Sequence, residues 1–139
     1  MSHRRGIWIP VATGLIQKEG KVLLGQRPKG NSLAGQWEFP GGKIELGESP
    51  EQALERELRE ELDIHAEIGA LRLATTHSYG DKGILLLFFD VHFWKNEPKT
   101  VQHSELKWVP IGEILSLDIP QANRKILDRL LEVLKTPVK

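Results

Sequence analysis

A short stretch around residue 50 determines where one helix must begin. Ser49 can accept a hydrogen bond from an orphan backbone amide, Pro50 suits the first helical position, and Gln52 completes a capping box. Leucine then recurs at every fourth position, at 54, 58 and 62, and forms one apolar stripe. The spacing predicts an amphipathic helix from about Pro50 to Leu62, whose leucine stripe must be covered by another layer of the fold.

The segments on either side of this helix have the pattern of strands, because β-branched and apolar residues alternate there with small or polar ones. Strands are expected over residues 6–17, 21–26, 68–76, 84–94 and 106–109. A second helix is expected over residues 121–134, with a buried stripe of Ile126, Leu127, Leu130, Leu131 and Leu134. Strands wrapped by two helices indicate a mixed α/β sandwich. No repeat or linker divides the chain, so we expect a single domain over residues 1–139.

Composition excludes several classes of function. The 19 basic and 19 acidic residues cancel, which argues against binding to a long nucleic-acid tract or to a membrane surface. The sequence has no cysteine, so disulfides, thiol nucleophiles and thiolate metal sites are ruled out. The longest apolar run, over residues 84–89, is too short to span a bilayer. We therefore expect a soluble cytoplasmic protein.

The predicted helix over residues 50–62 also carries the strongest chemical signal. At about 100° per residue, Glu57, Glu60 and Glu61 fall within one arc of about 100° beside the leucine stripe. Like charges four residues apart cost about 0.2–0.5 kcal/mol, and a divalent cation removes that conflict. Clustered carboxylates suit a hard ion, Mg²⁺ or Mn²⁺. The alternative is a solvated helix with ion pairs such as Glu55–Arg59.

The surroundings of these glutamates form a longer pattern. Gly42 is followed after five residues by Glu48, and after seven more by the run from Arg56 to Glu61. This 23-residue stretch resembles the Nudix box at every specified position except Asp63, where that family usually has glycine. Aspartate tolerates left-handed backbone better than most residues, so little functional damage is expected there.

The resemblance to the Nudix family implies a fold and a chemistry. It implies an α/β/α sandwich with a mixed β-sheet between helices, a loop–helix–loop catalytic box, and hydrolysis of nucleoside diphosphates linked to a further group. It implies that Glu57, Glu60 and Glu61 bind the metal and catalyse, and that the Gly41 carbonyl is a further ligand. It also implies that Arg56 orients a glutamate while Glu48 braces the box. The implied cofactor is Mg²⁺, with Mn²⁺ as a substitute.

Two further stretches are similar to the MutT-like subgroup of this family, at residues 37–43 and 120–123. By that resemblance Asn123 reads the edge of a guanine base, Arg27 and Lys43 contact the substrate, and Phe39 lines the base pocket. An amide can donate and accept together, which suits a purine edge. The alternatives are that Asn123 only caps the last helix and that Arg27 is a solvated loop charge.

One departure from the family pattern leaves the general base open. The family often has a glutamate in a loop shortly before the late tryptophan, and counting back from Trp108 places Gln102 there. An amide cannot serve as a general base. Either Glu105 or His103 substitutes, or a box glutamate, Glu60 or Glu61, takes the role.

These features together predict a Mg²⁺-dependent pyrophosphohydrolase. We expect it to cleave a purine nucleoside triphosphate, with guanine or 8-oxoguanine as the base, into a nucleoside monophosphate and pyrophosphate. The rival hypotheses are hydrolysis of a triphosphorylated RNA 5′ end to a monophosphate, cleavage of a nucleotide sugar or dinucleoside polyphosphate, and a non-catalytic nucleotide sensor. The oligomeric state stays open, and a homodimer is compatible with the sequence.

Overall fold

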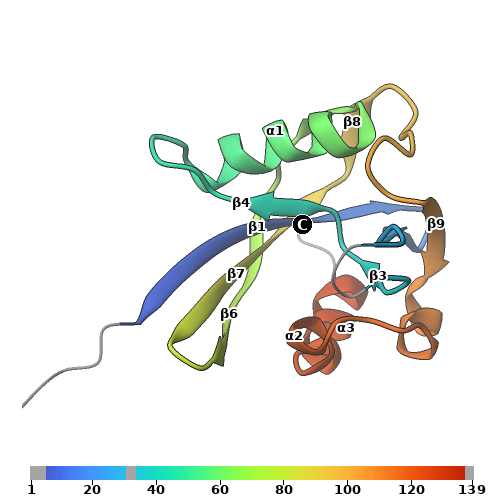
Figure 1. Cartoon of the computed structure of the whole chain (residues 1–139). Coiled ribbons are helices and arrows are strands. Elements are labelled where there is room, and N and C mark those ends of the chain that lie inside the picture. The colour runs from blue at the N-terminus through green and yellow to red at the C-terminus, as the bar shows by residue number, and fades with distance from the viewer. Residues whose placement is uncertain (1–5, 31–33, 137–139) are drawn as a thin grey trace, which may run out of the picture.

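The computed structural model describes residues 6–30 and 34–136, and for Gln121 and Ala122 it describes the backbone alone. A long mixed sheet lies at the centre of the fold, with helices on either side (Figure 1). In chain order the elements are β1 (Ile7–Lys18), β2 (Lys21–Gln26), β3 (Trp37–Glu38), β4 (Gly41–Lys43), α1 (Pro50–Leu62), β5 (His65–Glu67), β6 (Leu71–Tyr79), β7 (Lys82–Val91), β8 (Phe93–Lys95), β9 (Glu105–Pro110), the 3₁₀ helix η1 (Ile111–Ser116), α2 (Gln121–Arg124) and α3 (Leu127–Lys135).

The sheet has the strand order β3-β2-β1-β7-β6, with β4 also paired to β1 and β9 also paired to β2. β1 and β7 run parallel, in register from Ile7 opposite Lys82 to Ile16 opposite Val91. The other pairs of this sheet are antiparallel, so it is mixed. β5 and β8 form a separate antiparallel pair.

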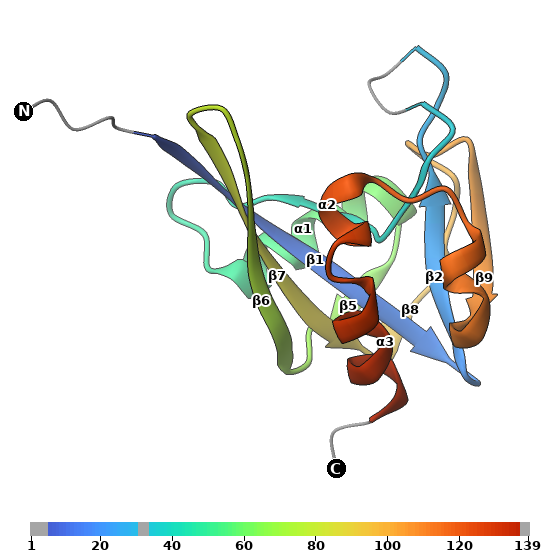
Figure 2. The same ribbon diagram turned by 90° about the horizontal axis from the view of Figure 1, so that it is seen from below.

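The hairpin of β1 and β2 is paired only near its turn, with Gln17 opposite Val22 and Lys18 opposite Lys21. Beyond these positions the two strands diverge (Figure 2). β1 continues between β4 and β7, whereas β2 continues between β3 and β9. The sheet is therefore divided into two halves that separate from a common hairpin.

Side-chain alternation along β1 builds a core on each face of the sheet. On one face Ala12 and Ile16 pack in a cluster with the leucine stripe of α1. On the other face Leu15 packs in a cluster with residues of α3, among them Leu130. Figures 1 and 2 show α1 on one side of the sheet and α2 and α3 on the other. The predicted α/β/α sandwich is confirmed.

α1 has the predicted boundaries and the predicted capping at both ends. The Gln52 amide donates to Ser49 Oγ at 3.1 Å, and the Ser49 amide donates to Gln52 Oε1 at 2.9 Å. At the other end Asp63 has a left-handed backbone, with φ 57° and ψ 38°, and its amide donates to the Arg59 carbonyl. Aspartate therefore fills the position usually held by glycine.

The prediction of one helix over residues 121–134 is wrong. The structure has two helices, because Ile126 has φ −110° and ψ 9°, which are not helical angles. The Asn123 carbonyl accepts the Ile126 amide at 3.2 Å and closes a turn between the helices. All five apolar residues of the predicted stripe are nevertheless buried, because the turn keeps both helices against the same core.

Several strand boundaries also differ from the prediction. β6 starts at Leu71 and runs to Tyr79, and β7 begins at Lys82, because the two strands pair up to a tight turn at Gly80. The strand predicted over 84–94 ends at Val91, and Phe93 starts the separate strand β8. The sequence did not predict β4, β5 and η1, because each is too short for a repeating pattern of apolar residues to be recognised. Within the described residues no helix is long and apolar enough to cross a bilayer.

Candidate functional site

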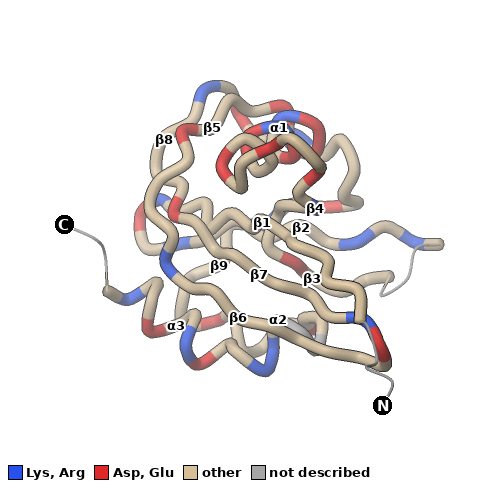
Figure 3. The backbone as a smooth tube through the Cα atoms, turned by 90° about the vertical axis from the view of Figure 1, so that its left-hand side faces the viewer, with Lys and Arg blue, Asp and Glu red and all other residues tan. Residues whose placement is uncertain are grey.

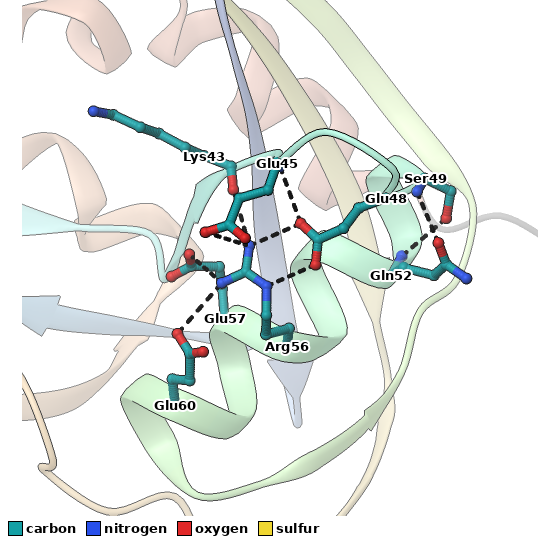
Figure 4. A network of polar contacts seen from close by, with 8 residues as sticks. All are labelled: Lys43, Glu45, Glu48, Ser49, Gln52, Arg56, Glu57 and Glu60. Atoms are coloured by element: carbon teal, nitrogen blue, oxygen red, sulfur yellow. Dashed lines mark hydrogen bonds and ion pairs between the residues drawn. The ribbon is translucent and has the colours of Figure 1, made fainter.

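Arg56 joins the loop before α1 to the carboxylates on the helix (Figure 4). Its Nε and Nη2 atoms donate to the two oxygens of Glu48 at 2.7 and 2.9 Å. Its Nη1 atom donates to Glu57 at 2.9 Å and to Glu60 at 3.3 Å, and Nη2 also donates to the Lys43 carbonyl. One planar guanidinium thus determines the positions of three carboxyl groups and a strand end.

Glu48 ties this network to the backbone of the loop. Its Oε1 atom also accepts the Glu45 amide at 3.0 Å. The hydrogen bond from Arg56, helped by this amide, lowers the pKa of Glu48 to about 2. The same contact is the main cause that raises the pKa of Arg56. Glu48 is therefore ionised at every physiological pH, and its contact with Arg56 is maintained.

Replacing Glu48 with glutamine is expected to remove part of the acid dependence of folding. Since the folded-state pKa lies below the ordinary value of 4.5, ionised Glu48 contributes stability above about pH 4.5 that is lost as the pH falls toward 2. The stability difference between wild type and Glu48→Gln should therefore shrink below pH 4.5. Urea unfolding in EDTA between pH 7 and pH 3 measures it, and a difference that is constant with pH would contradict the assignment.

Glu57 lies against a glycine that leaves room for its carboxyl group. A Cβ atom on Gly42 would come within 2.4 Å of the Glu57 carboxyl carbon. A similar close approach occurs at Gly41, where φ is 152° and a Cβ atom would lie 2.2 Å from the Ala12 carbonyl oxygen. The two glycines let β4 pack closely against both β1 and α1, which places the Gly41 backbone beside the carboxylates.

Glu61 is the buried member of the helix carboxylates, with a relative exposure of 4%. Burial raises the pKa of Glu61 to about 9, and the neighbouring Glu57 and Glu38 carboxyl groups act in the same direction. Its Oε2 atom is buried and has no hydrogen-bond partner among the described residues. A buried carboxyl group with a free oxygen is costly by itself and suits a cation ligand.

A cavity of about 230 Å³ brings these groups together. It is lined by Arg27, Pro28, Glu38, Gly41, Glu57, Glu61, Gln102 and His103. Two of the three predicted metal carboxylates and the predicted carbonyl ligand therefore share one cavity with Arg27 and Gln102. In Figure 3 much of the backbone of α1 has the colour of acidic residues.

Glu60 takes a different position from the other two helix carboxylates. Its side chain is 50% exposed, and it faces Arg56 rather than the cavity. Within the described ranges, no three acidic or imidazole side chains converge on one point as a closed cage. Mg²⁺ does not require such a cage, because it keeps several waters and is held by one or two carboxylates. Glu57, Glu61 and the Gly41 carbonyl fit that donor set.

The residues predicted to contact the base lie elsewhere. Phe39 is buried in the α3-side core, with its ring edge-on to Phe88 at 6.1 Å. Asn123 is half-buried on α2. The segment before α2 is held beside β3, because the Trp37 amide donates to the Asp118 carbonyl at 2.7 Å. The alternative that Asn123 caps the last helix is wrong, because it lies inside α2 and the residue preceding α3 is Ile126.

Two other predicted residues are outside the cavity. Lys43 is exposed at the end of β4, and its side chain extends away from the Arg56 network (Figure 4). Glu105 is exposed at the start of β9 and does not line the cavity. His103, named with Glu105 as a replacement for the loop glutamate, does line it and is buried.

Sequence reasoning missed Glu38. Its Oε1 atom accepts from Arg27 at 2.8 Å, and its Oε2 atom lies 3.0 Å from His103 Nε2. The available signal was alternation, since Trp37 and Phe39 are buried on the α3 side and the residue between them faces the opposite side.

Comparison with known proteins agrees with this geometry. The sequence profile of the family described as "NUDIX domain" matches residues 11–129. The chain belongs to the Nudix family. The resemblance drawn from the box is thus confirmed, and the chain is a MutT-like Nudix hydrolase.

Similar Nudix proteins span nearly the whole chain. An 8-oxo-dGTP diphosphatase of Haemophilus influenzae is 41% identical over 88% of this chain and 91% of its own length. A CTP pyrophosphohydrolase of Escherichia coli is 36% identical over the same shares. Among solved structures, the E. coli ORF135 protein has a TM-score of 0.85 at 33% identity, covering 96% of both chains. The MutT protein of Methanosarcina mazei Go1 has a TM-score of 0.82 at 27% identity, covering 97% of this chain and 100% of its own.

Proposed function

We propose that this Nudix hydrolase uses Mg²⁺ to hydrolyse a phosphoanhydride bond of a guanine or 8-oxoguanine nucleoside triphosphate, releasing nucleoside monophosphate and pyrophosphate. The observation that carries the proposal is the single cavity that holds Glu57, Glu61 and the Gly41 backbone beside Arg27. The name of the Haemophilus relative supports the choice of substrate. A location in the cytoplasm is part of the proposal, because nucleotide pools are found there.

In this proposal some residues bind the metal or the phosphates, and others hold those residues in position. Glu57, Glu61 and the Gly41 carbonyl would hold the metal, with Mn²⁺ able to replace Mg²⁺. When bound, a divalent ion neutralises phosphate charge and activates water. Arg56 holds Glu57 in place through its contact with Glu48. Arg27, at the opposite side of the cavity, would contact the phosphates with its fixed positive charge.

The base of the nucleotide would be recognised from the α3 side of the sheet. Phe39, directly after β3, would line that pocket, and Asn123 would pair with the guanine edge from α2. Lys43, exposed on β4, would contact the substrate from outside the cavity.

Asn123→Ala is expected to change base preference and to leave the chemistry alone. The variant lacks the side-chain amide that would hydrogen-bond the guanine edge, so discrimination between guanine and other bases should fall by about 1–3 kcal/mol. The measurement is the ratio of kcat/KM for GTP to that for ATP. An unchanged ratio would remove the support for guanine recognition by this residue.

Gln102→Ala is expected to lower kcat by less than about tenfold, or about 1.4 kcal/mol of barrier. The physical reason is that an amide cannot be the general base, so another group must take that role. Steady-state kinetics at saturating Mg²⁺ give the comparison. A much larger loss with unchanged metal affinity would indicate that this loop position is still catalytic.

A substrate panel tests the proposed function itself. dGTP, 8-oxo-dGTP, GTP, CTP, a nucleotide sugar and a 5′-triphosphorylated RNA are each incubated with and without Mg²⁺, and the nucleoside monophosphate or the 5′-monophosphorylated RNA that forms is measured. We expect 8-oxo-dGTP or dGTP to have the highest kcat/KM. CTP is included because the E. coli relative carries that activity in its name. Preference for CTP or for the RNA end would overturn the choice of substrate, and no turnover on any compound would indicate a nucleotide sensor.

A further inference from the structure

The cavity has a second wall that the Nudix box does not supply. α1 and β4 contribute Glu57, Glu61 and Gly41, whereas β3 and the segment before β9 contribute Glu38, Gln102 and His103. We infer that Glu38 is a further metal-holding carboxylate of this site, acting from β3 and positioned by Arg27 and His103. Among the described residues no three acidic side chains converge without metal, so Glu38 would join Glu57 and Glu61 around the ion only when it binds. This inference rests on the proposed function, because it adds a ligand to the same metal site.

Glu38 is held so that part of its carboxyl group stays available. Arg27 Nη1 donates to Oε1 at 2.8 Å, and His103 Nε2 lies 3.0 Å from Oε2. An ionised carboxylate has about four lone-pair positions, so these two contacts leave one position free on each oxygen. Carboxylates that bind metals are commonly oriented by hydrogen bonds of this kind.

His103 is itself fixed in position by the strand beneath it. Its ring lies on Gly25 of β2, where a Cβ atom would come within 2.5 Å of the ring. The Ser104 amide donates to the Gln26 carbonyl at 3.0 Å and holds the segment that carries the ring. The side chain of His103 is only 3% exposed, so its orientation is determined by packing.

The same imidazole places Glu38 next to the buried box carboxylate. His103 Nε2 is 3.0 Å from Glu38 Oε2 and 3.7 Å from Glu61 Oε1. Glu61 in turn has a buried Oε2 atom without a hydrogen-bond partner among the residues described. Glu38 and Glu61 thus line the same cavity from opposite walls, and the buried Oε2 atom of Glu61 lacks the partner that a cation between the walls would provide.

The identity of the neighbouring loop residue strengthens the inference. Gln102 also lines the cavity from the second wall, and its amide brings no negative charge. Glu38 lines the same cavity and supplies a carboxylate from the same wall. In a purely structural alternative, the ion pair of Glu38 with Arg27 only holds the segment after β2 against β3. Measuring the metal affinity of a Glu38 variant distinguishes the two roles.

The test uses Mn²⁺ alone as the probe, with free ion measured by electron paramagnetic resonance. Glu38→Gln removes the charge and keeps a hydrogen-bond acceptor for Arg27 or His103. Its Mn²⁺ affinity is expected to fall about tenfold or more, while its Tm in EDTA stays close to that of wild type. The matched control is Glu67→Gln, which removes an exposed charge on β5 and should bind Mn²⁺ like wild type. Binding by Glu38→Gln within about threefold of this control overturns the inference.

A parallel variant separates this inference from the proposed function. If Glu57→Gln loses Mn²⁺ binding and Glu38→Gln keeps it, the box binds metal and only the role of Glu38 is wrong. If neither variant differs from wild type, the metal site of the proposed function is wrong as well.

A crystallographic test uses the wild-type protein alone, so it does not depend on the folding of a variant. Crystals of the wild-type protein soaked in Mn²⁺ should give an anomalous peak at about 2.0–2.6 Å from a Glu38 oxygen. Peaks that contact only α1 and Gly41 would overturn the inference.

Discussion

Glu61→Gln is expected to lower kcat by about 10³-fold or more, which corresponds to about 4 kcal/mol of barrier. The metal-free fold should survive this change. Since the pKa of Glu61 is raised to about 9, its carboxyl group is neutral at pH 7 without metal, and glutamine is a neutral group of the same shape. We expect the Tm of the variant in EDTA to lie within about 3 °C of wild type.

The response of stability to Mg²⁺ completes this test. Saturating Mg²⁺ should raise the Tm of wild type, because a ligand that binds only the folded state stabilises it. Glu61→Gln should lose most of that increase. The control is Glu55→Gln, an exposed charge on the same helix. A Glu61→Gln protein with wild-type turnover at saturating Mg²⁺ would refute the assignment of Glu61.

Arg56→Lys is expected to weaken Mn²⁺ binding by about 10–100-fold although the positive charge is kept. Lysine has no planar fork, so it cannot bind both oxygens of Glu48 and hold Glu57 at the same time. Calorimetric titration with Mn²⁺ measures the loss, and kcat/KM should fall with it. Arg59→Lys serves as the control, since Arg59 is exposed on the same helix. If Arg56→Lys binds Mn²⁺ as tightly as Arg59→Lys does, a positive charge at position 56 is sufficient and the planar fork is not needed.

Local sequence rules predicted α1 well because each of its signals acts within a few residues. The capping box lies within four residues, and the left-handed Asp63 is bonded to Arg59 in the preceding turn. The helical arc likewise placed Glu57, Glu60 and Glu61 together. The helical arc could not predict which of the three glutamates is most buried. The burial of Glu61 depends on β4 and on His103, which are distant in sequence.

The parts that the sequence did not predict depend on long-range contacts. Glu38 and His103 meet across 65 positions of the chain, so no local pattern joins them. The break before α3 depends on how Ile126 fits a core made by strands far away in sequence. The roles of the site residues, the single domain over residues 1–139 and the oligomeric state stay predictions.

The divergence of β1 and β2 from their shared turn has a consequence for engineering. Because the two strands pair only near residues 17–22, the half-sheet with β4 and α1 and the half-sheet with β3 and β9 form separate walls of one cavity. The wall of α1 carries the carboxylates of the box, and the other wall carries Arg27 and Gln102. A library that varies the second wall but keeps Glu38 and His103 can therefore search for new substrates while the Nudix box keeps its own packing.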